Sequence, residues 1–187
     1  MNAKLAQRIL KIAKWDIDLN VPEDVRKKCV MIVAPHTSLW DWVLGKMVFA
    51  AMEIKPVVMI KKEFFAFPIG GLLRKLGGIP VDRKNPKRLP MEMAERFANS
   101  DHLCVVITPE GTRKRTEKWK KGFYFIARQA QVPIAIGYTD WGHKRCGIFP
   151  NTFMPTGNYD ADLAFIQQHY FGMIGKYKGQ FNLEDKK

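Results

Sequence analysis

Short apolar runs alternate with segments of helical spacing along most of this chain. Residues 30–34 and 102–108 are largely apolar runs, which are typical of strands buried on both faces of a sheet. Residues 89–99 and 122–131 instead place apolar side chains three or four positions apart, which predicts one buried face on each of two helices. This alternation predicts an α/β fold with a largely parallel central sheet flanked by helices.

The same criteria predict the remaining elements of the core. Further strands are expected at 57–60, 79–81, 132–138 and 145–149, and further helices at 42–52 and 160–173. The length of 187 residues predicts a single domain, 1–187, with a core at 30–175 and a polar, loosely held tail at 176–187.

The first twenty residues have the pattern of a basic amphipathic helix. Within residues 3–15, the side chains of Leu5, Ile9 and Ile12 share one side, and basic residues follow at the same spacing. Such a helix can lie in a membrane interface, or it can pack on the domain with its lysines in water. The sequence leaves both interpretations open.

Composition adds a preference for anionic partners. The net charge of +13 favours phosphate substrates, acidic proteins, anionic membranes or nucleic acid. No apolar run reaches the roughly 18–20 residues that span a bilayer, and the first residues lack the pattern of a signal peptide. The odd set of Cys29, Cys104 and Cys146 has no repeated spacing, so we expect a reducing, cytoplasmic location, no disulfide framework and no zinc site.

His36 and Asp41 follow the first predicted core strand, which ends at Pro35. An imidazole titrates near neutral pH and can accept a proton from a hydroxyl group, and a carboxylate on its other ring nitrogen fixes its tautomer. Asp41 also fits a different role, because an acidic residue three positions after Ser38 can bond back to the start of a helix.

A second candidate cluster, Glu110-Gly111-Thr112-Arg113, follows the predicted strand at 102–108. The guanidinium of Arg113 can hold a phosphate through two parallel hydrogen bonds, and Glu110 can orient that arginine or another base. The alternative is a tight turn with a solvated ion pair. Arg83 ends another predicted strand and reaches the same edge if the sheet is parallel; the alternative is a surface charge in a basic loop.

Taken in order, these segments resemble the glycerolipid acyltransferase family, in particular bacterial 1-acyl-sn-glycerol-3-phosphate acyltransferases. The resemblance rests on four blocks: HTSLWD at 36–41, KKEFFAFPIG at 61–70 with GGIPVDR at 77–83, PEGTR at 109–113, and VPI at 132–134. Each block alone is a weak signal, whereas four in order are specific.

The resemblance implies a glycerol-3-phosphate acyltransferase-like fold and acyl transfer in phospholipid biosynthesis. His36 would act as general base on the hydroxyl of a lysophosphatidic acid-type acceptor, and Asp41 would orient it. The donor would be acyl carrier protein or acyl-CoA, without a metal or a covalent acyl-enzyme. The acceptor and its phosphate would contact Arg83, Glu110, Gly111, Thr112 and Arg113.

Three departures from the family pattern leave the acceptor open. Pro35 stands where the family often has Asn, Thr108 where it often has Phe, and Lys114 where it often has Ser. A lyso-aminolipid or another lyso-lipid is therefore an alternative acceptor. A non-enzymatic binder of anionic lipid or nucleic acid is the remaining alternative, although no aromatic stacking pattern for nucleic acid is present.

Membrane contact would be peripheral in this interpretation. It would come from the basic first helix and from the apolar segment at 64–76, because anionic lipid attracts lysines at about 1 kcal/mol each. The same segment also fits a plain core, or an apolar ledge for the acyl chain, and we favour the ledge.

Overall fold

The apolar run at residues 30–34 forms the central strand β2 (Lys28–Ala34) of the computed structural model, which describes residues 1–66, 68–82 and 88–186. Successive side chains of a strand point to opposite faces of its sheet. Cys29 and Met31 of β2 lie in one hydrophobic cluster, and Val30 and Ile32 lie in another. Because both faces of β2 are buried, its sequence is apolar at almost every position.

Within the described residues, seven strands form one sheet in the order β1-β7-β6-β2-β5-β3-β4. The pairs β6–β2, β2–β5, β5–β3 and β3–β4 are parallel, and β7 runs antiparallel to β6. The strands are β1 (Asp16–Ile17), β2, β3 (Val57–Lys61), β4 (Gly78–Val81), β5 (Leu103–Ile107), β6 (Ile134–Asp140) and β7 (Arg145–Ile148). The prediction of a largely parallel α/β sheet is confirmed.

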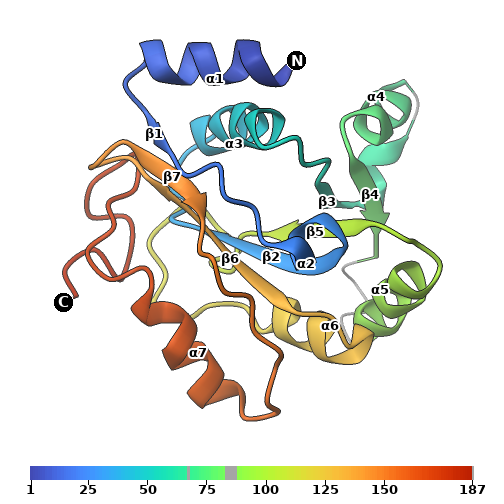
Figure 1. Cartoon of the computed structure of the whole chain (residues 1–187). Coiled ribbons are helices and arrows are strands. Elements are labelled where there is room, and N and C mark those ends of the chain that lie inside the picture. The colour runs from blue at the N-terminus through green and yellow to red at the C-terminus, as the bar shows by residue number, and fades with distance from the viewer. Residues whose placement is uncertain (67, 83–87, 187) are drawn as a thin grey trace.

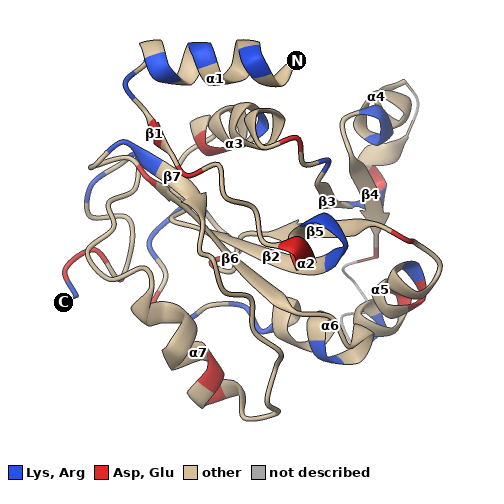
Figure 2. Cartoon of the chain, in the orientation of Figure 1, with Lys and Arg blue, Asp and Glu red and all other residues tan. Residues whose placement is uncertain are grey.

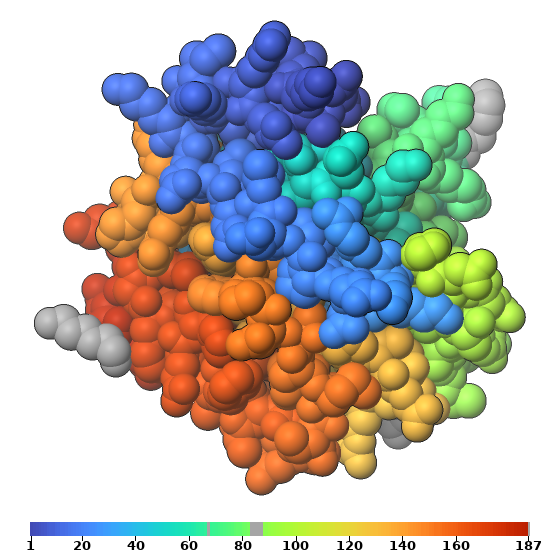
Figure 3. Space-filling model, viewed as in Figure 1, coloured from blue at the N-terminus to red at the C-terminus, as the bar shows by residue number. Residues whose placement is uncertain are grey.

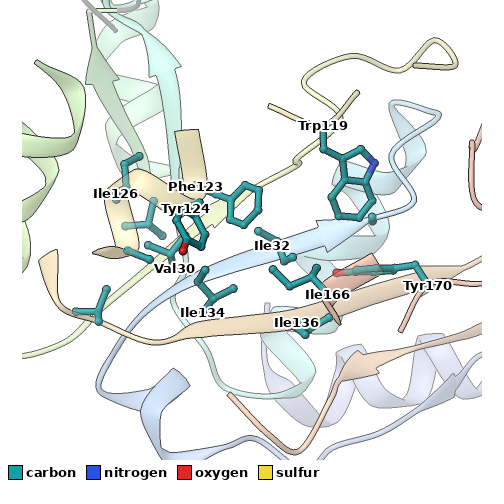
Figure 4. Close-up of a cluster of buried hydrophobic side chains, with 14 of the residues drawn as sticks. Val30, Ile32, Trp119, Phe123, Tyr124, Ile126, Ile134, Ile136, Ile166 and Tyr170 are labelled. Carbon is teal, nitrogen blue, oxygen red and sulfur yellow. The ribbon is translucent and has the colours of Figure 1, made fainter. Parts of the chain in front are cut away.

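Helices cover both faces of this sheet (Figure 1). The helices are α1 (Ala3–Ile12), α2 (Glu23–Arg26), α3 (Trp40–Ala51), the 3-10 helix η1 (Lys62–Phe65), α4 (Ile69–Lys75), α5 (Leu89–Ala98), α6 (Gly122–Ala130) and α7 (Tyr159–Gln168). Side chains of α1 and α3 pack on one face, and those of α5, α6 and α7 pack on the other. Figure 4 shows the second of these clusters, in which Phe123 and Ile126 of α6 meet Val30 and Ile134 of the sheet.

The connections after β2 and β5 explain where a site can form. The two strands are parallel neighbours, so their carboxyl ends meet at the same edge. After β2 the chain enters α3 on one face of the sheet, and after β5 it enters α6 on the opposite face. Two loops that diverge in this way open a crevice at the carboxyl edge, where ligands of α/β sheets bind.

Helix α1 packs on the domain through a side other than its stripe of Leu5, Ile9 and Ile12. Ala6 and Leu10 are fully buried against α3, whereas Leu5, Ile9 and Ile12 remain exposed, Ile12 by 82%. Figure 3 shows α1, in dark blue, as an outer layer over α3. Within the described residues, no helix is long and apolar enough to cross a membrane.

The tail is not loose as we expected. Phe181 is only 1% exposed and Leu183 only 2%, and both belong to the core cluster on the α6 face. The backbone N–H of Gly172 donates to the carbonyl of Leu183. Phe181 and Leu183 are therefore sufficient to anchor this otherwise polar stretch. The average composition of 176–187 does not reveal this anchoring, because polar residues dominate it.

The segment at 64–76 is neither core nor cavity wall in the described residues. Phe64, Ile69 and Leu72 are each more than half exposed. The apolar walls of the main cavity come from other parts of the chain.

Gly70 allows α4 to begin close to η1, since a Cβ atom there would lie 2.0 Å from the carbonyl oxygen of Phe65.

Candidate active site

His36 and Asp41 meet at the carboxyl end of β2. The Nδ1 atom of His36 lies 3.2 Å from Oδ2 of Asp41. Pro35 ends the strand one residue earlier, and Asp41 lies in the first turn of α3. Since Nδ1 faces the carboxylate, Nε2 is the imidazole nitrogen left to act on a ligand.

Asp41 also performs the helix-start role that its spacing suggested. Its Oδ2 atom accepts the backbone N–H of Thr37 at 2.8 Å and that of Ser38 at 2.9 Å. The two interpretations of Asp41 are therefore compatible, because one carboxylate both closes the loop and faces the imidazole. Backbone donors fix the position of this carboxylate relative to His36.

Glu110 supports the histidine loop from the neighbouring strand. Its side chain is only 4% exposed, and its Oε1 atom accepts the backbone N–H of His36 at 2.8 Å. The Oε2 atom is buried and has no hydrogen-bond partner in the described part of the chain. Glu110 thus lies beneath the loop and not in the cavity wall.

The carboxyl group of Glu110 is buried with a hydrogen-bond partner, among the described residues, on only one of its two oxygens, and this burial changes its pKa. Removal from water raises the pKa of its carboxyl group to about 7, while backbone hydrogen bonds, including the one from His36, act in the opposite direction. The nearby imidazole also lowers this pKa, and Asp41 raises it. A buried carboxyl that titrates near neutral pH next to a histidine is typical of functional sites.

A cavity of about 970 Å³ opens over these loops. His36 and Asp41 contribute to its lining, together with Gly111, Thr112 and Arg113 from the loop after β5. Its walls are mainly apolar and come from both sides of the sheet edge: Val33, Phe49, Val58, Met59, Val81, Val106, Ile107, Phe123 and Ile126. The cavity therefore joins the His–Asp pair to an apolar space and to a cationic rim.

Arg113 is exposed at this rim, and Lys120 and Lys121 line the same cavity. Gly111 has a φ of +66°, a conformation that glycine adopts readily, and a Cβ atom there would lie 2.9 Å from the Lys120 side chain. The turn thus places the side chains of Thr112 and Arg113 beside the cavity. Arg83 lies outside the described residues, so its predicted role stays a prediction.

Trp141 is a site residue that sequence reasoning missed. Its indole N–H donates to Oδ1 of Asp41 at 2.7 Å, across 100 positions of sequence. It follows β6, whose carboxyl end lies beside that of β2. The only signal available was its position after a predicted parallel strand, since no motif contains it.

Among the described residues, no group of three or more His, Cys, Asp or Glu side chains is arranged to hold a metal ion.

Together, these features define an α/β protein with a His–Asp pair in a cavity at the carboxyl edge of a mostly parallel sheet. The model of the Acyltransferase family matches residues 16–136. This match covers more than half of the chain, and the chain belongs to that family.

Related proteins carry one recurring name. The chain is 32% identical over 111 residues to a 1-acyl-sn-glycerol-3-phosphate acyltransferase of Streptococcus pneumoniae, an alignment that covers 58% of this chain and 41% of the relative. It is 33% identical over 118 residues to the human 1-acyl-sn-glycerol-3-phosphate acyltransferase beta, covering 58% of this chain and 40% of the relative. The matching part thus spans about two fifths of these relatives.

The fold has a solved counterpart. The crystal structure of the 1-acyl-sn-glycerophosphate (LPA) acyltransferase, PlsC, from Thermotoga maritima superimposes with a TM-score of 0.58. The superposition covers 89% of this chain and 74% of that chain at 21% sequence identity. The mixed α/β architecture is therefore that of a known acyltransferase.

Proposed function

We propose that this chain transfers a fatty acyl group from a thioester to the hydroxyl group of a lysophosphatidic acid-type acceptor. The observation that carries the proposal is that His36, Asp41 and Arg113 line one and the same cavity, between apolar walls. A lyso-lipid with a phosphate headgroup has the same three parts: a hydroxyl, an anion and an acyl chain. The names of the relatives support the same reaction.

In the proposed reaction, Nε2 of His36 takes the proton of the acceptor hydroxyl. The oxygen attacks the thioester carbonyl, and the tetrahedral intermediate then expels the thiolate, which receives the proton from the imidazolium. Asp41 holds the imidazole through Nδ1 and stabilises its charged form. General-base catalysis of this kind contributes roughly 10²–10⁴-fold in rate.

Arg113 is the described residue best suited to the acceptor phosphate. Its guanidinium is exposed at the cavity rim, and Thr112 offers a hydroxyl beside it. Planar guanidinium groups bind phosphate through paired hydrogen bonds, which a lysine cannot reproduce. We propose that the turn at Gly111 places Thr112 and Arg113 beside the acceptor. We also propose that Glu110 holds the His36 loop in position.

The acyl donor in this proposal is acyl carrier protein or acyl-CoA, used as co-substrate with no further cofactor. In both donors the uncharged arm that bears the thioester is attached to phosphate. Lys120 and Lys121 at the cavity lining add positive charge where such a donor would enter.

We also propose peripheral contact with an anionic membrane surface. Helix α1 exposes Leu5, Ile9 and Ile12 beside basic residues, which Figure 2 shows in blue. Helices α1, α3 and α4 lie on the same side of the sheet (Figure 1). Trp42 of α3 is 50% exposed and also lines the cavity, so the surface formed by these helices continues into the candidate active site. An amphipathic basic helix binds anionic lipid surfaces.

The experiment that tests the function measures thiol release from acyl-CoA and from acyl carrier protein against a panel of acceptors. The panel contains lysophosphatidic acid, lysophosphatidylethanolamine, lysophosphatidylcholine and a lyso-aminolipid, and mass spectrometry identifies the product. We expect phosphatidic acid to form fastest. A higher rate on an acceptor without a phosphate monoester would assign a different lyso-lipid, and the absence of acyl transfer to all of them would refute the proposal.

A further inference from the structure

The two oxygens of the Asp41 carboxylate have separate partners. Oδ2 faces Nδ1 of His36 and accepts the backbone N–H groups of Thr37 and Ser38. Oδ1 accepts the indole N–H of Trp141 at 2.7 Å. A carboxylate turns about one bond, so a donor on Oδ1 determines where Oδ2 points.

The Trp141 ring is itself held from several directions. Its backbone N–H donates to the carbonyl of Ile174 at 2.9 Å. The Trp15 ring packs against it edge-on, with centroids 5.0 Å apart, and the ammonium group of Lys176 lies 4.3 Å from its centroid. The indole N–H therefore points at Asp41 from a fixed ring, and three segments distant in sequence fix it.

We propose that Trp141 is a positioning residue for acyl transfer, acting through Asp41. Its N–H keeps the carboxylate plane turned so that Oδ2 stays opposite Nδ1 of the imidazole. Trp141 lies beyond residues 16–136, the part matched by the family model. This inference rests on the proposed function, because it assigns Trp141 to the same reaction.

The location of Trp141 predicts which kinetic parameter depends on it. Trp141 is not among the residues that line the described cavity, whereas His36 and Asp41 are. Substrate binding should therefore be unaffected by loss of the indole N–H, and the chemical step should slow. A merely structural contribution would instead reduce the amount of folded protein.

The first test replaces Trp141 by Phe, which keeps an aromatic ring between Trp15 and Lys176 but removes the donor. We expect kcat to fall by about tenfold or more, with KM changed by less than about twofold. The matched control is Trp119→Phe, because the buried Trp119 N–H has no hydrogen-bond partner among the described residues. A kcat for Trp141→Phe within about twofold of the wild type would overturn the proposal.

The second test does not depend on activity or on the folding of the Trp141 variant. The chain contains five tryptophans, and a proton–nitrogen correlation spectrum records one indole N–H signal for each of them. We expect the Asp41→Ala variant to shift the assigned Trp141 signal upfield, as a lost charge-assisted hydrogen bond requires. No shift would overturn the proposed contact, even if Trp141→Phe proves unfolded. Absence of acyl transfer by the wild type would refute the proposed function separately.

Discussion

The backbone N–H of His36 donates to the Oε1 atom of Glu110 at 2.8 Å, which fastens the loop after β2 to the turn after β5. These residues lie 74 positions apart in sequence and come together because β2 and β5 are parallel neighbours. The position of the imidazole therefore depends on a carboxyl group that is itself buried and lies outside the cavity wall.

Glu110 should make the stability of the protein depend on pH. The pKa of its carboxyl is raised from 4.5 to about 7 in the folded chain, so the folded state holds a proton that the unfolded state has released. The free energy of unfolding should therefore fall as pH rises from about 5 to 7, by roughly 3 kcal/mol at most. Urea unfolding at intervals across this range measures it.

The variant that isolates this effect is Glu110→Gln, which keeps an oxygen acceptor for the His36 N–H but does not titrate. Its unfolding free energy should vary less between pH 5 and 7 than that of the wild type. Glu95→Gln, at an exposed position of α5, should leave the wild-type slope unchanged. An identical slope in the wild type and Glu110→Gln would contradict the assignment.

Arg113 should contribute to acceptor binding through its charge and its shape. We expect Arg113→Ala to lower kcat/KM for lysophosphatidic acid by about 10- to 100-fold, the loss expected for a hydrogen-bonded charge. Arg113→Lys should recover only part of it, since an ammonium group cannot form paired hydrogen bonds. Lys114→Ala, at the next position but outside the cavity lining, is the control and should remain near the wild type.

The exposed apolar side of α1 should determine membrane binding without determining stability. Replacing Leu5, Ile9 and Ile12 by Ser should weaken binding to vesicles rich in anionic lipid, measured by sedimentation, while the thermal midpoint stays within a few degrees. Met154→Ser changes an exposed apolar residue away from α1 and should not affect binding. Equal sedimentation of the triple variant and the wild type would show that α1 is not the contact.

The tail should contribute to stability through one aromatic side chain. Phe181 is 1% exposed and its ring centroid lies 6.4 Å from that of Tyr170. Phe181→Ala should lower the free energy of unfolding by about 3–5 kcal/mol, as for other buried phenylalanines. The exposed neighbour Gln180 serves as control through Gln180→Ala, which should change stability by less than about 0.5 kcal/mol. An unchanged free energy of unfolding in Phe181→Ala would instead indicate that the tail is loosely held.

Local patterns predicted the central elements well because they are set by burial. Met93 and Phe97 are buried on α5 at their predicted helical spacing, and β2 is apolar because both of its faces are covered. The edge on which His36 and Gly111 meet also follows from parallel strands. These features depend on short-range periodicity and on one topological rule.

The features that sequence analysis missed depend on contacts distant in sequence. Nothing near Trp141 indicates that its indole reaches Asp41, and nothing near Glu110 indicates that its buried carboxylate accepts the backbone N–H of His36. The stripe of Leu5, Ile9 and Ile12 left membrane contact and packing on the domain open. In the structure this stripe is exposed, and Ala6 and Leu10 pack against α3 instead. Small residues permit close helix packing, which hydrophobicity alone does not predict.

The central claim is that Nε2 of His36 is the base, and the acyl-transfer rate of His36→Ala tests it most directly. His102→Ala is the matched control, because His102 lies at the amino end of β5, away from the cavity. We predict that His36→Ala folds normally and loses acyl transfer by at least about 100-fold, while His102→Ala stays near the wild type. A His36→Ala variant that transfers acyl groups at the wild-type rate would contradict the account.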